Sequence, residues 1–415
     1  MMNTTATGSP APPSGLHYGW VIVGVGTLTI VACLGLARFS FGMLLPAMRD
    51  TLGMSYDEMG WLGTANFAGY LAAVGVTPLL LRRVTPRQMI AGGLLLIAVC
   101  IFFIALCNSY LSILLFYSLV GIGSGFANIP LMVLVSYWFR SDQRGRAAGL
   151  IVIGSGFAII FSGFIIPLLN ARFGADGWRA SWLLISLIVL IIAIIAALLI
   201  RNNPAEKGLE PCGRNNLEDT ASAASKKNFS SRQILTQLGV LYFIFGATYV
   251  IYGTFIVTTL IEEYGFAEAS AGHFWSWVGF FSLFSGTLFG TLSDRIGRKG
   301  GLMVVFGVQT LAYLLAGLKL GTIAIFSSIM FYGVAAFAIP AIMAAAVGDY
   351  LGKARAATGF SLITFSFAIG QTLGPALAGA VAENSGTFTG SYLCSAGLTA
   401  AAIIFAAFLP APSGN

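Results

Sequence analysis

The chain is built from about a dozen apolar stretches, each long enough to cross a lipid bilayer as a helix. A membrane-spanning helix needs roughly 20 apolar residues. The stretches lie at 18–46, 56–81, 88–107, 110–138, 147–170, 178–200, 234–261, 271–293, 300–318, 321–348, 356–381 and 388–409. Only 9% of the 415 residues are charged, against about 25% in a soluble protein. We therefore predict an all-α integral membrane protein with twelve transmembrane helices.

The basic residues gather on one side of the predicted membrane. Seventeen Lys and Arg residues fall in the central loop and in the loops after the second, fourth, eighth and tenth helices, against four in loops on the opposite face. By the positive-inside rule, both termini and the central loop are expected in the cytoplasm. Topology thus accounts for the formal charge of +7, and we predict no nucleic-acid partner.

The only long polar segment, 201–233, divides the chain into two sets of six helices. The predicted organisation is a disordered tail at 1–17, a six-helix bundle at 18–200, a linker at 201–233, a second bundle at 234–409 and a tail at 410–415. The bundles repeat each other: "GFANIPLMVLVSYWFRSDQRGRAAGL" and "AFAIPAIMAAAVGDYLGKARAATGF" share Phe-Ala, Ile-Pro and Arg-Ala-Ala in the same order. Pseudo-symmetric six-helix repeats are typical of a large transporter fold with its substrate site near the midplane.

The loop after the eighth predicted helix carries a recognisable motif. Its sequence, "GTLSDRIGRK", resembles the loop signature of the major facilitator superfamily through Gly290, Asp294, Arg295, Gly297, Arg298 and Lys299. The resemblance implies a secondary transporter that works by alternating access. Asp294 would cap the following helix or pair with Arg298, closing the cytoplasmic side in one state and releasing it in another.

Both ends of the first predicted helix point to one branch of that superfamily. "HYGWVIV" and "FSFGMLLPAMRDTLGMS" are similar to bacterial relatives of the monocarboxylate and oxalate/formate carriers. The Asp and Arg that eukaryotic monocarboxylate carriers place on the eighth helix are missing from "FFSLFSGTLFG". The resemblance therefore suggests a small organic anion as substrate, without transferring the proton-coupling scheme.

Arg38 is the one basic residue inside the first apolar stretch, which runs from Trp20 to about Leu45. It lies five or six residues beyond the centre of that stretch, roughly 8–9 Å along a helix, within a hydrocarbon half-thickness of about 15 Å. None of the fifteen Asp and Glu residues is expected at mid-membrane. An incoming anion can supply the missing partner, because a guanidinium matches the geometry of a carboxylate. The alternative is that Arg38 snorkels to the outer interface or binds helix-end carbonyls.

Further polar and aromatic side chains within the predicted helices are candidates for the substrate pocket. A polar group facing lipid is costly unless it is satisfied, so these side chains should point inward, either to bind substrate or to join helices. They are Asn66, Tyr70, Asn128, Tyr249, Tyr252, Tyr332 and Gln371.

Two residues near the outer face are candidates for carrying a transported proton. His273 begins the eighth helix beside two tryptophans, and Glu262 ends the seventh. A histidine titrates near neutral pH, although such a cluster also fits an interfacial aromatic belt. For Glu262 the alternative is a solvated rim position.

The inventory of reactive groups argues against an enzyme. The chain has two histidines, no deep carboxylate pair and no phosphate-binding G-x-x-x-x-G-K-[ST] motif, so neither a hydrolytic nor a metal site is expected. We predict no cofactor, and transport driven by a gradient.

The sequence thus predicts a monomeric secondary transporter of the bacterial inner membrane that moves a small organic anion by proton symport or anion exchange. The alternative is efflux of hydrophobic or cationic compounds through an aromatic cavity. A membrane receptor that retains the fold without transporting is a third class left open.

Overall fold

The computed structural model of the protein describes residues 17–213 and 231–410. Residues 1–16 and 411–415 of the predicted tails, and residues 214–230 of the predicted linker, lie outside the described residues.

The first half of the chain forms a bundle of six membrane crossings. Some crossings are single helices and others are joined segments. They are α1 (Tyr18–Ile30), the π-helix η1 (Val31–Phe39) and α2 (Ser40–Leu52), which form one crossing; α3 (Tyr56–Leu80); α4 (Pro86–Leu106); α5 (Tyr110–Trp138); α6 (Ser141–Val152) with α7 (Gly154–Phe173); and α8 (Gly177–Leu199). Two short 3-10 turns, η2 (Gly174–Asp176) and η3 (Pro204–Lys207), lie before and after α8.

The second half repeats this arrangement. Its elements are α9 (Ser231–Thr258) with the π-helix η4 (Thr259–Glu263), α10 (Glu268–Gly317), α11 (Thr322–Ala335) with α12 (Ala338–Leu351), α13 (Lys353–Ser385) and α14 (Thr389–Ala407). The chain turns inside α10 at Gly297, whose φ of 83° and ψ of 157° are not helical. Because positive φ favours glycine, this turn depends on the glycine of the loop motif.

The helices of the structure account for the twelve predicted membrane crossings. Within the described residues, nine helical stretches are long and apolar enough to span a membrane. Two of them, Asp142–Leu199 and Glu268–Gly317, hold 58 and 50 residues, and each includes a turn, so each crosses twice. The remaining crossing is α3. The all-α membrane fold with two six-helix bundles is therefore confirmed.

Three crossings differ in detail from the predicted stretches. The first continues to Leu52, beyond the expected end at 46, and contains the π-helix η1. The fifth is divided near Ile153 into α6 and α7. The tenth is divided at Phe337, three residues before Pro340. Proline has no backbone N–H to donate to the carbonyl four residues earlier, so a continuous helix would lose a hydrogen bond here.

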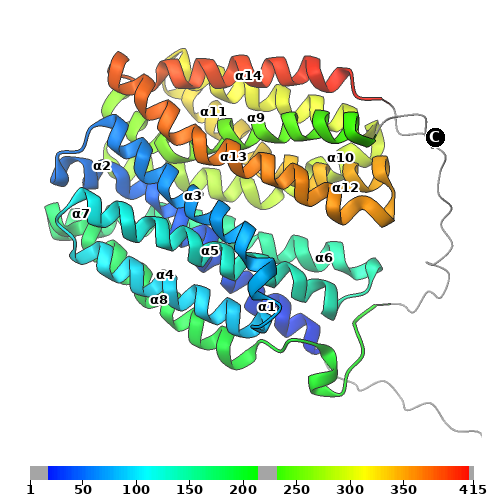
Figure 1. Cartoon of the computed structure of the whole chain (residues 1–415). Coiled ribbons are helices and arrows are strands. Elements are labelled where there is room, and N and C mark those ends of the chain that lie inside the picture. The colour runs from blue at the N-terminus through cyan, green and yellow to red at the C-terminus, as the bar shows by residue number, and fades with distance from the viewer. Residues whose placement is uncertain (1–16, 214–230, 411–415) are drawn as a thin grey trace, which may run out of the picture.

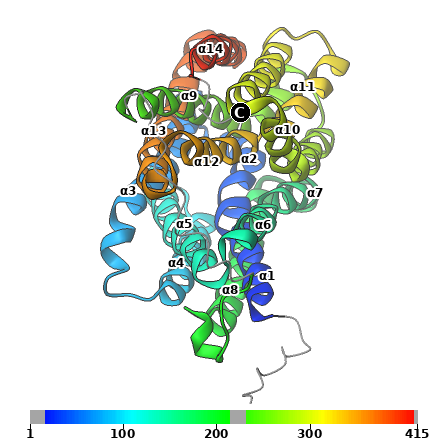
Figure 2. The ribbon, with the colours of Figure 1, turned by 90° about the vertical axis from the view of Figure 1, so that its right-hand side faces the viewer.

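The two bundles lie side by side (Figure 1), with α1–α8 in one and α9–α14 in the other. The chain enters α1 and leaves α14 at the same end of the molecule, as an even number of crossings requires. Seen from that end, the ribbons of the two bundles stand apart in the middle (Figure 2). At the opposite end they are joined, for example by Arg49 and Glu262, whose side chains are 2.8 Å apart.

Glycines allow the helices that surround the centre to pack closely. A Cβ atom at Gly121 of α5 would lie 1.9 Å from the Asn66 carbonyl oxygen of α3. Small residues at such contacts let helix backbones approach in a membrane, where lipid offers no hydrophobic driving force for association. This contact fixes α3 and α5, the two helices that carry most of the candidate site in the first bundle.

Candidate functional site

Arg38 lies at the end of the π-helical segment η1, buried between the two bundles. Only 8% of the residue is exposed. Its guanidinium carbon lies 4.6 Å from the ring centroid of Phe67 and 4.6 Å from that of Tyr70, both on α3. π-helical turns within α-helices occur often at functional sites, and an aromatic face attracts a cation. The guanidinium is therefore held by two aromatic rings of α3.

Two nitrogen atoms of the Arg38 guanidinium, Nε and Nη2, are buried. Within the described part of the chain, Nε and Nη2 make no hydrogen bond. A buried charge without hydrogen bonds is costly. The arginine thus offers two adjacent donors to a group that the described residues do not supply.

A small pocket opens beside the guanidinium at the junction of the two bundles. From the first bundle it is lined by Arg38, Phe39, Phe41, Gly63, Phe67 and Tyr117, and from α9 by Val250, Gly253 and Thr254. Its walls are mostly aromatic or aliphatic, with Thr254 as a polar residue and the guanidinium as the charged group. The cavity volume of about 10 Å³ has room for about one water molecule. In this conformation the lining of the pocket, and not its size, therefore matches a ligand with one anionic end and a compact apolar body.

Four of the predicted polar residues form two pairs close to Arg38. Asn128 Nδ2 donates a hydrogen bond to the Tyr70 hydroxyl at 2.9 Å, and Gln371 Nε2 donates one to the Tyr249 hydroxyl. The Arg38 guanidinium is also close enough to the Tyr249 hydroxyl to act on it electrostatically. One pair belongs to each bundle, so both bundles contribute polar groups to the surroundings of the guanidinium.

The other three predicted pocket residues bond to neighbouring helices. Asn66 Nδ2 donates to the Tyr117 carbonyl at 3.1 Å. Tyr252 and Tyr332 stack with ring centroids 4.1 Å apart inside the second bundle. Their hydroxyls pair with the Ser328 hydroxyl and the Tyr249 carbonyl, each at 2.8 Å. Of the eight residues predicted to bind substrate, only Arg38 itself lines the pocket beside its guanidinium.

The two candidates for proton transfer lie away from this pocket. His273 is an exposed residue whose ring lies 5.5 Å from that of Phe164, in a surface pocket lined by Phe266, Ser270 and two further aromatic residues. Glu262 lies in η4 and binds Arg49 at 2.8 Å and the Tyr56 hydroxyl at 2.6 Å. Glu262 therefore joins the two bundles.

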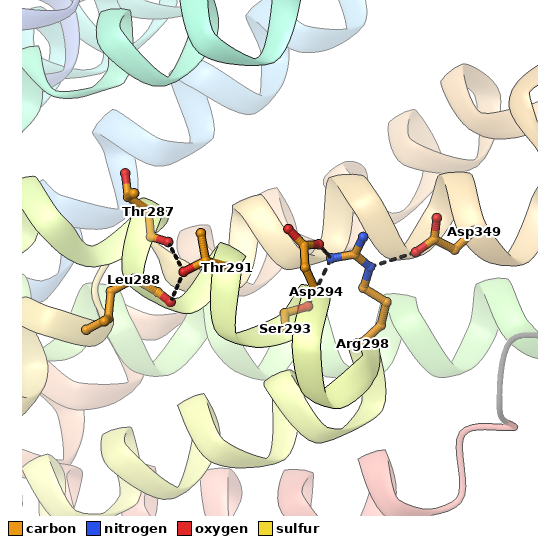
Figure 3. Close-up of polar contacts among 7 residues, drawn as sticks. All are labelled: Thr287, Leu288, Thr291, Ser293, Asp294, Arg298 and Asp349. Carbon is orange, nitrogen blue, oxygen red and sulfur yellow. Dashed lines mark hydrogen bonds and ion pairs between the residues drawn. The ribbon is translucent and has the colours of Figure 1, made fainter. Parts of the chain in front are cut away.

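The loop motif forms a charged cluster at the end of the molecule where the bundles stand apart (Figure 3). Arg298 bridges Asp294, at 2.5 Å, and Asp349 near the end of α12, at 2.6 Å. It also donates to the Ser293 hydroxyl at 3.1 Å. Burial lowers the pKa of Arg298, but its hydrogen bonds to Asp349 and Asp294 outweigh burial and raise it overall.

All these contacts of the motif lie within the second bundle, where they tie the α10 turn to α12. Gly297 provides the turn itself. Asp294, Arg295 and Ile296 are exposed. Gly290 is partly buried on the helix before the turn. Lys299 follows the turn and is partly buried.

Sequence reasoning missed several residues of the site. Phe67 and Tyr117 were not singled out, although Phe67 is one helical turn before Tyr70. The α9 residues Val250, Gly253 and Thr254 are uncharged, so nothing in the sequence distinguished them as residues of the pocket. Only the spacing of three between Phe67 and Tyr70 could have indicated that both rings face the same arginine.

Comparison with known proteins identifies the family. The family model described as "Uncharacterised MFS-type transporter YbfB" matches residues 30–409. Relatives include the oxalate:formate antiporter of Oxalobacter formigenes (24% identical, over 93% of this chain and 90% of the relative) and monocarboxylate transporter 2 of Homo sapiens (22%, over 94% and 85%). The agnestins efflux protein AgnL12 of Paecilomyces divaricatus is 28% identical, over 81% and 74%.

A solved structure shows the same fold. The bacterial homologue of the human lysosomal transporter Spinster, in an inward-facing and unoccupied conformation, superposes with a TM-score of 0.71 over 95% of this chain and 96% of the other, at 16% identity. The predicted resemblance to the major facilitator superfamily and to its monocarboxylate and oxalate/formate carriers is therefore confirmed.

Proposed function

Because the chain belongs to the family described as uncharacterised MFS-type transporter YbfB, we propose that it carries a small organic anion of the monocarboxylate type across the membrane. The family is one of transporters, which supports a transport function over an enzymatic one. Arg38 is the residue that recognises the anion in this proposal, and the small pocket beside it widens, as the bundles move, to receive the rest of the substrate.

One observation carries the proposal: the Arg38 guanidinium is buried, yet its Nε and Nη2 atoms have no hydrogen-bond partner within the described residues. These two donors form one edge of a planar fork, which matches the two oxygens of a carboxylate. A substrate carboxylate placed there would satisfy both donors and neutralise the buried charge. The oxalate:formate antiporter and the monocarboxylate transporter among the relatives support an anion of this kind.

The neighbouring residues have positioning or lining roles in this proposal. Tyr70 and Tyr249, held by Asn128 and Gln371, present hydroxyl groups from the two bundles to the same substrate. Asn66, Tyr252 and Tyr332 support the helices behind them. When the bundles rock about this centre, the hydroxyls on one side move relative to those on the other, which would let the site release its substrate.

The conformation of the protein fits alternating access with the cytoplasmic side open. The bundles are joined at the end that the basic residues assign to the outside, and we propose that both termini and the motif of Asp294 and Arg298 lie on the cytoplasmic side of a bacterial inner membrane. The motif would close that side in the opposite conformation. Proton symport and anion exchange are both compatible with this scheme, and His273 and Glu262 are the candidate proton carriers in the first.

The test is thermal stabilisation of the purified protein by formate, acetate, lactate and oxalate, compared between the wild type and Arg38→Gln. A ligand at 100 times its dissociation constant stabilises the folded state by about 2.7 kcal/mol. We expect at least one monocarboxylate to raise the melting temperature of the wild type and to have no effect on the variant. Arg172→Gln is the matched control, because Arg172 is an exposed arginine at the end of α7.

The alternative, efflux of hydrophobic or cationic compounds, draws on the aromatic walls of the pocket and on the efflux protein among the relatives. It predicts the opposite result. Lipophilic cations or neutral aromatic compounds would stabilise the wild type and Arg38→Gln equally, and the carboxylates would stabilise neither. That outcome would make Arg38 a structural residue.

A further inference from the structure

An arginine of the first crossing lies over an aromatic ring of α3 at two places, once from η1 and once from α2. The Arg38 guanidinium lies over Phe67 at 4.6 Å, and the Arg49 guanidinium lies over Tyr56 at 4.1 Å. Arg49 follows Arg38 by eleven residues, and Tyr56 precedes Phe67 by eleven. The first crossing and α3 are consecutive and antiparallel, so the second pair lies closer to the outer end than the first.

An eleven-residue spacing keeps both pairs on one face of their helices. Eleven residues make three helical turns to within about 20° and rise about 16 Å. Arg38 and Arg49 therefore point in similar directions from the first crossing, and Phe67 and Tyr56 do so from α3. We call the upper pair, Arg49 with Tyr56, the outer station.

The outer station holds a carboxylate, which shows what such a pair binds. Glu262 from the second bundle places Oε1 2.8 Å from Arg49 Nη1 and Oε2 2.6 Å from the Tyr56 hydroxyl. Each carboxylate oxygen thus has its own donor, one cationic and one phenolic. The lower pair lacks this partner, since Arg38 Nε and Nη2 are unbonded within the described residues.

The contact with Glu262 depends on the two bundles being together at the outer end. Arg49 and Tyr56 belong to the first bundle and Glu262 to the second, so separation of the bundles there removes the carboxylate from the station. Arg49 keeps a bond from its Nε to the Met54 carbonyl at 3.2 Å within the first bundle. The guanidinium would therefore stay in place while Nη1 loses its acceptor.

The geometry points to the outer station as a second anion site, where a substrate carboxylate from outside replaces Glu262 on Arg49 and Tyr56 before it moves down the same helix face to Arg38. This inference rests on the proposed function and adds a capture step to it. Return of Glu262 to Arg49 then expels the anion from the station and closes the outer side. The ligand is a small carboxylate.

The experiment distinguishes a capture site from a simple latch, by which we mean an Arg49–Glu262 ion pair that only holds the two bundles together. In a latch, Arg49 and Glu262 are equivalent, so Arg49→Gln and Glu262→Gln should change transport alike. In a capture site they differ, because only Arg49 binds the substrate and Glu262 competes with it. Uptake of radiolabelled formate, acetate, lactate and oxalate is measured in right-side-out vesicles that contain the full chain, with thermal stabilisation of each purified variant as the measure of binding at Arg38.

We expect Arg49→Gln to raise the KM for external anion by about tenfold and to weaken the dependence of uptake on ionic strength, because a charge that steers the anion is lost. Glu262→Gln should lower the KM, since the competing carboxylate is gone. Both variants should keep the stabilisation by carboxylates that Arg38→Gln loses. Arg172→Gln, an exposed arginine near the same end, should leave the KM unchanged.

Equal changes of KM in Arg49→Gln and Glu262→Gln would overturn the inference and leave a latch. An unchanged KM in Arg49→Gln would overturn it as well. If Arg49→Gln also abolished stabilisation by carboxylates, Arg49 would belong to the Arg38 site and not to a separate station. A wild type that is neither stabilised by nor takes up any of the four anions would refute the proposed function itself, and the capture step with it.

Discussion

The Ser124 hydroxyl of α5 donates a hydrogen bond to the Cys33 carbonyl of the π-helix η1 at 2.7 Å. The bond joins the segment that carries Arg38 to a helix of the same bundle, and Ser124 is fully buried. On the other side of η1, a Cβ atom at Gly35 would lie 2.2 Å from the Ala158 Cβ of α7. The π-helix η1 is therefore packed between α5 and α7, and these contacts fix the direction in which the Arg38 side chain points.

Ser124→Ala should weaken both the fold and the site. Loss of one buried hydrogen bond costs about 1 kcal/mol of folding stability, so the melting temperature should fall by a few degrees. Stabilisation by carboxylates should also decrease, because η1 is freer to return to α-helical geometry and turn Arg38 away. The control is Ser118→Ala, whose hydroxyl bonds within its own helix to the Leu115 carbonyl at 2.7 Å. Equal behaviour of the two variants would argue against a positioning role for Ser124.

Gly121→Ala should prevent close packing of α3 on α5. The added Cβ would lie 1.9 Å from the Asn66 carbonyl oxygen, and overpacking of this kind costs about 1–3 kcal/mol or more. Gly92→Ala is the matched control in a neighbouring helix, since nothing lies within 4 Å of its added Cβ. There alanine should be neutral or stabilising, by up to about 1 kcal/mol, because it favours the helix. Melting temperatures and expression in the membrane measure both effects, and similar losses in the two variants would contradict the packing argument.

The fold was predictable because length and polarity suffice for it in a membrane. Apolar stretches define the crossings, and a bilayer accepts only helices or closed barrels. The loop motif with Gly297 then pointed to the family. Arg38 was identified for a related reason, since a charge inside an apolar stretch requires a partner.

Details that depend on side-chain geometry were not predictable. A π-helical turn contains about one residue more than an α-helical turn. The composition of η1 resembles that of the flanking helices, so the sequence does not reveal the change of geometry. Spacing predicts that Tyr249 and Tyr252 share a side of α9, but not that the Tyr252 hydroxyl reaches Ser328 within the second bundle. Arg49 looked like an ordinary loop residue, because its contact with Glu262 joins positions 213 apart in the sequence.

Arg298→Lys should destabilise the second bundle although it keeps the charge. Arg298 uses Nε for Asp349 and Nη1 for Asp294, and a lysine has one ammonium group that cannot occupy both positions. These carboxylates are partly exposed, so the loss should be small, about 1 kcal/mol or less. Arg295→Lys, at an exposed neighbouring position, is the control, and thermal unfolding at low and high salt is the measurement. A loss that is the same for both variants would show that the bridge contributes nothing.

Cys212 should react slowly with maleimides at neutral pH, and Asp142→Asn should make it react faster. The residue follows α8 and is bound to the end of α5 through its N–H to the Trp138 carbonyl at 2.8 Å and its carbonyl to the Arg140 N–H at 2.9 Å. Burial, and then the Asp142 carboxylate, raise the pKa of its thiol. Since the thiolate is the reactive form, a raised pKa lowers the rate at neutral pH, and the rate should increase as the pH rises.

Removal of the Asp142 charge lowers that pKa and so increases the thiolate fraction. The measurement is labelling by a membrane-impermeant maleimide in inside-out vesicles, with Cys212→Ser identifying the labelled position. A Glu206→Gln variant removes a carboxylate from the same segment that is not among the groups acting on Cys212, and it should leave the rate unchanged. If Asp142→Asn labels no faster than Glu206→Gln, the segment after α8 does not hold Cys212 beside Asp142 in the membrane.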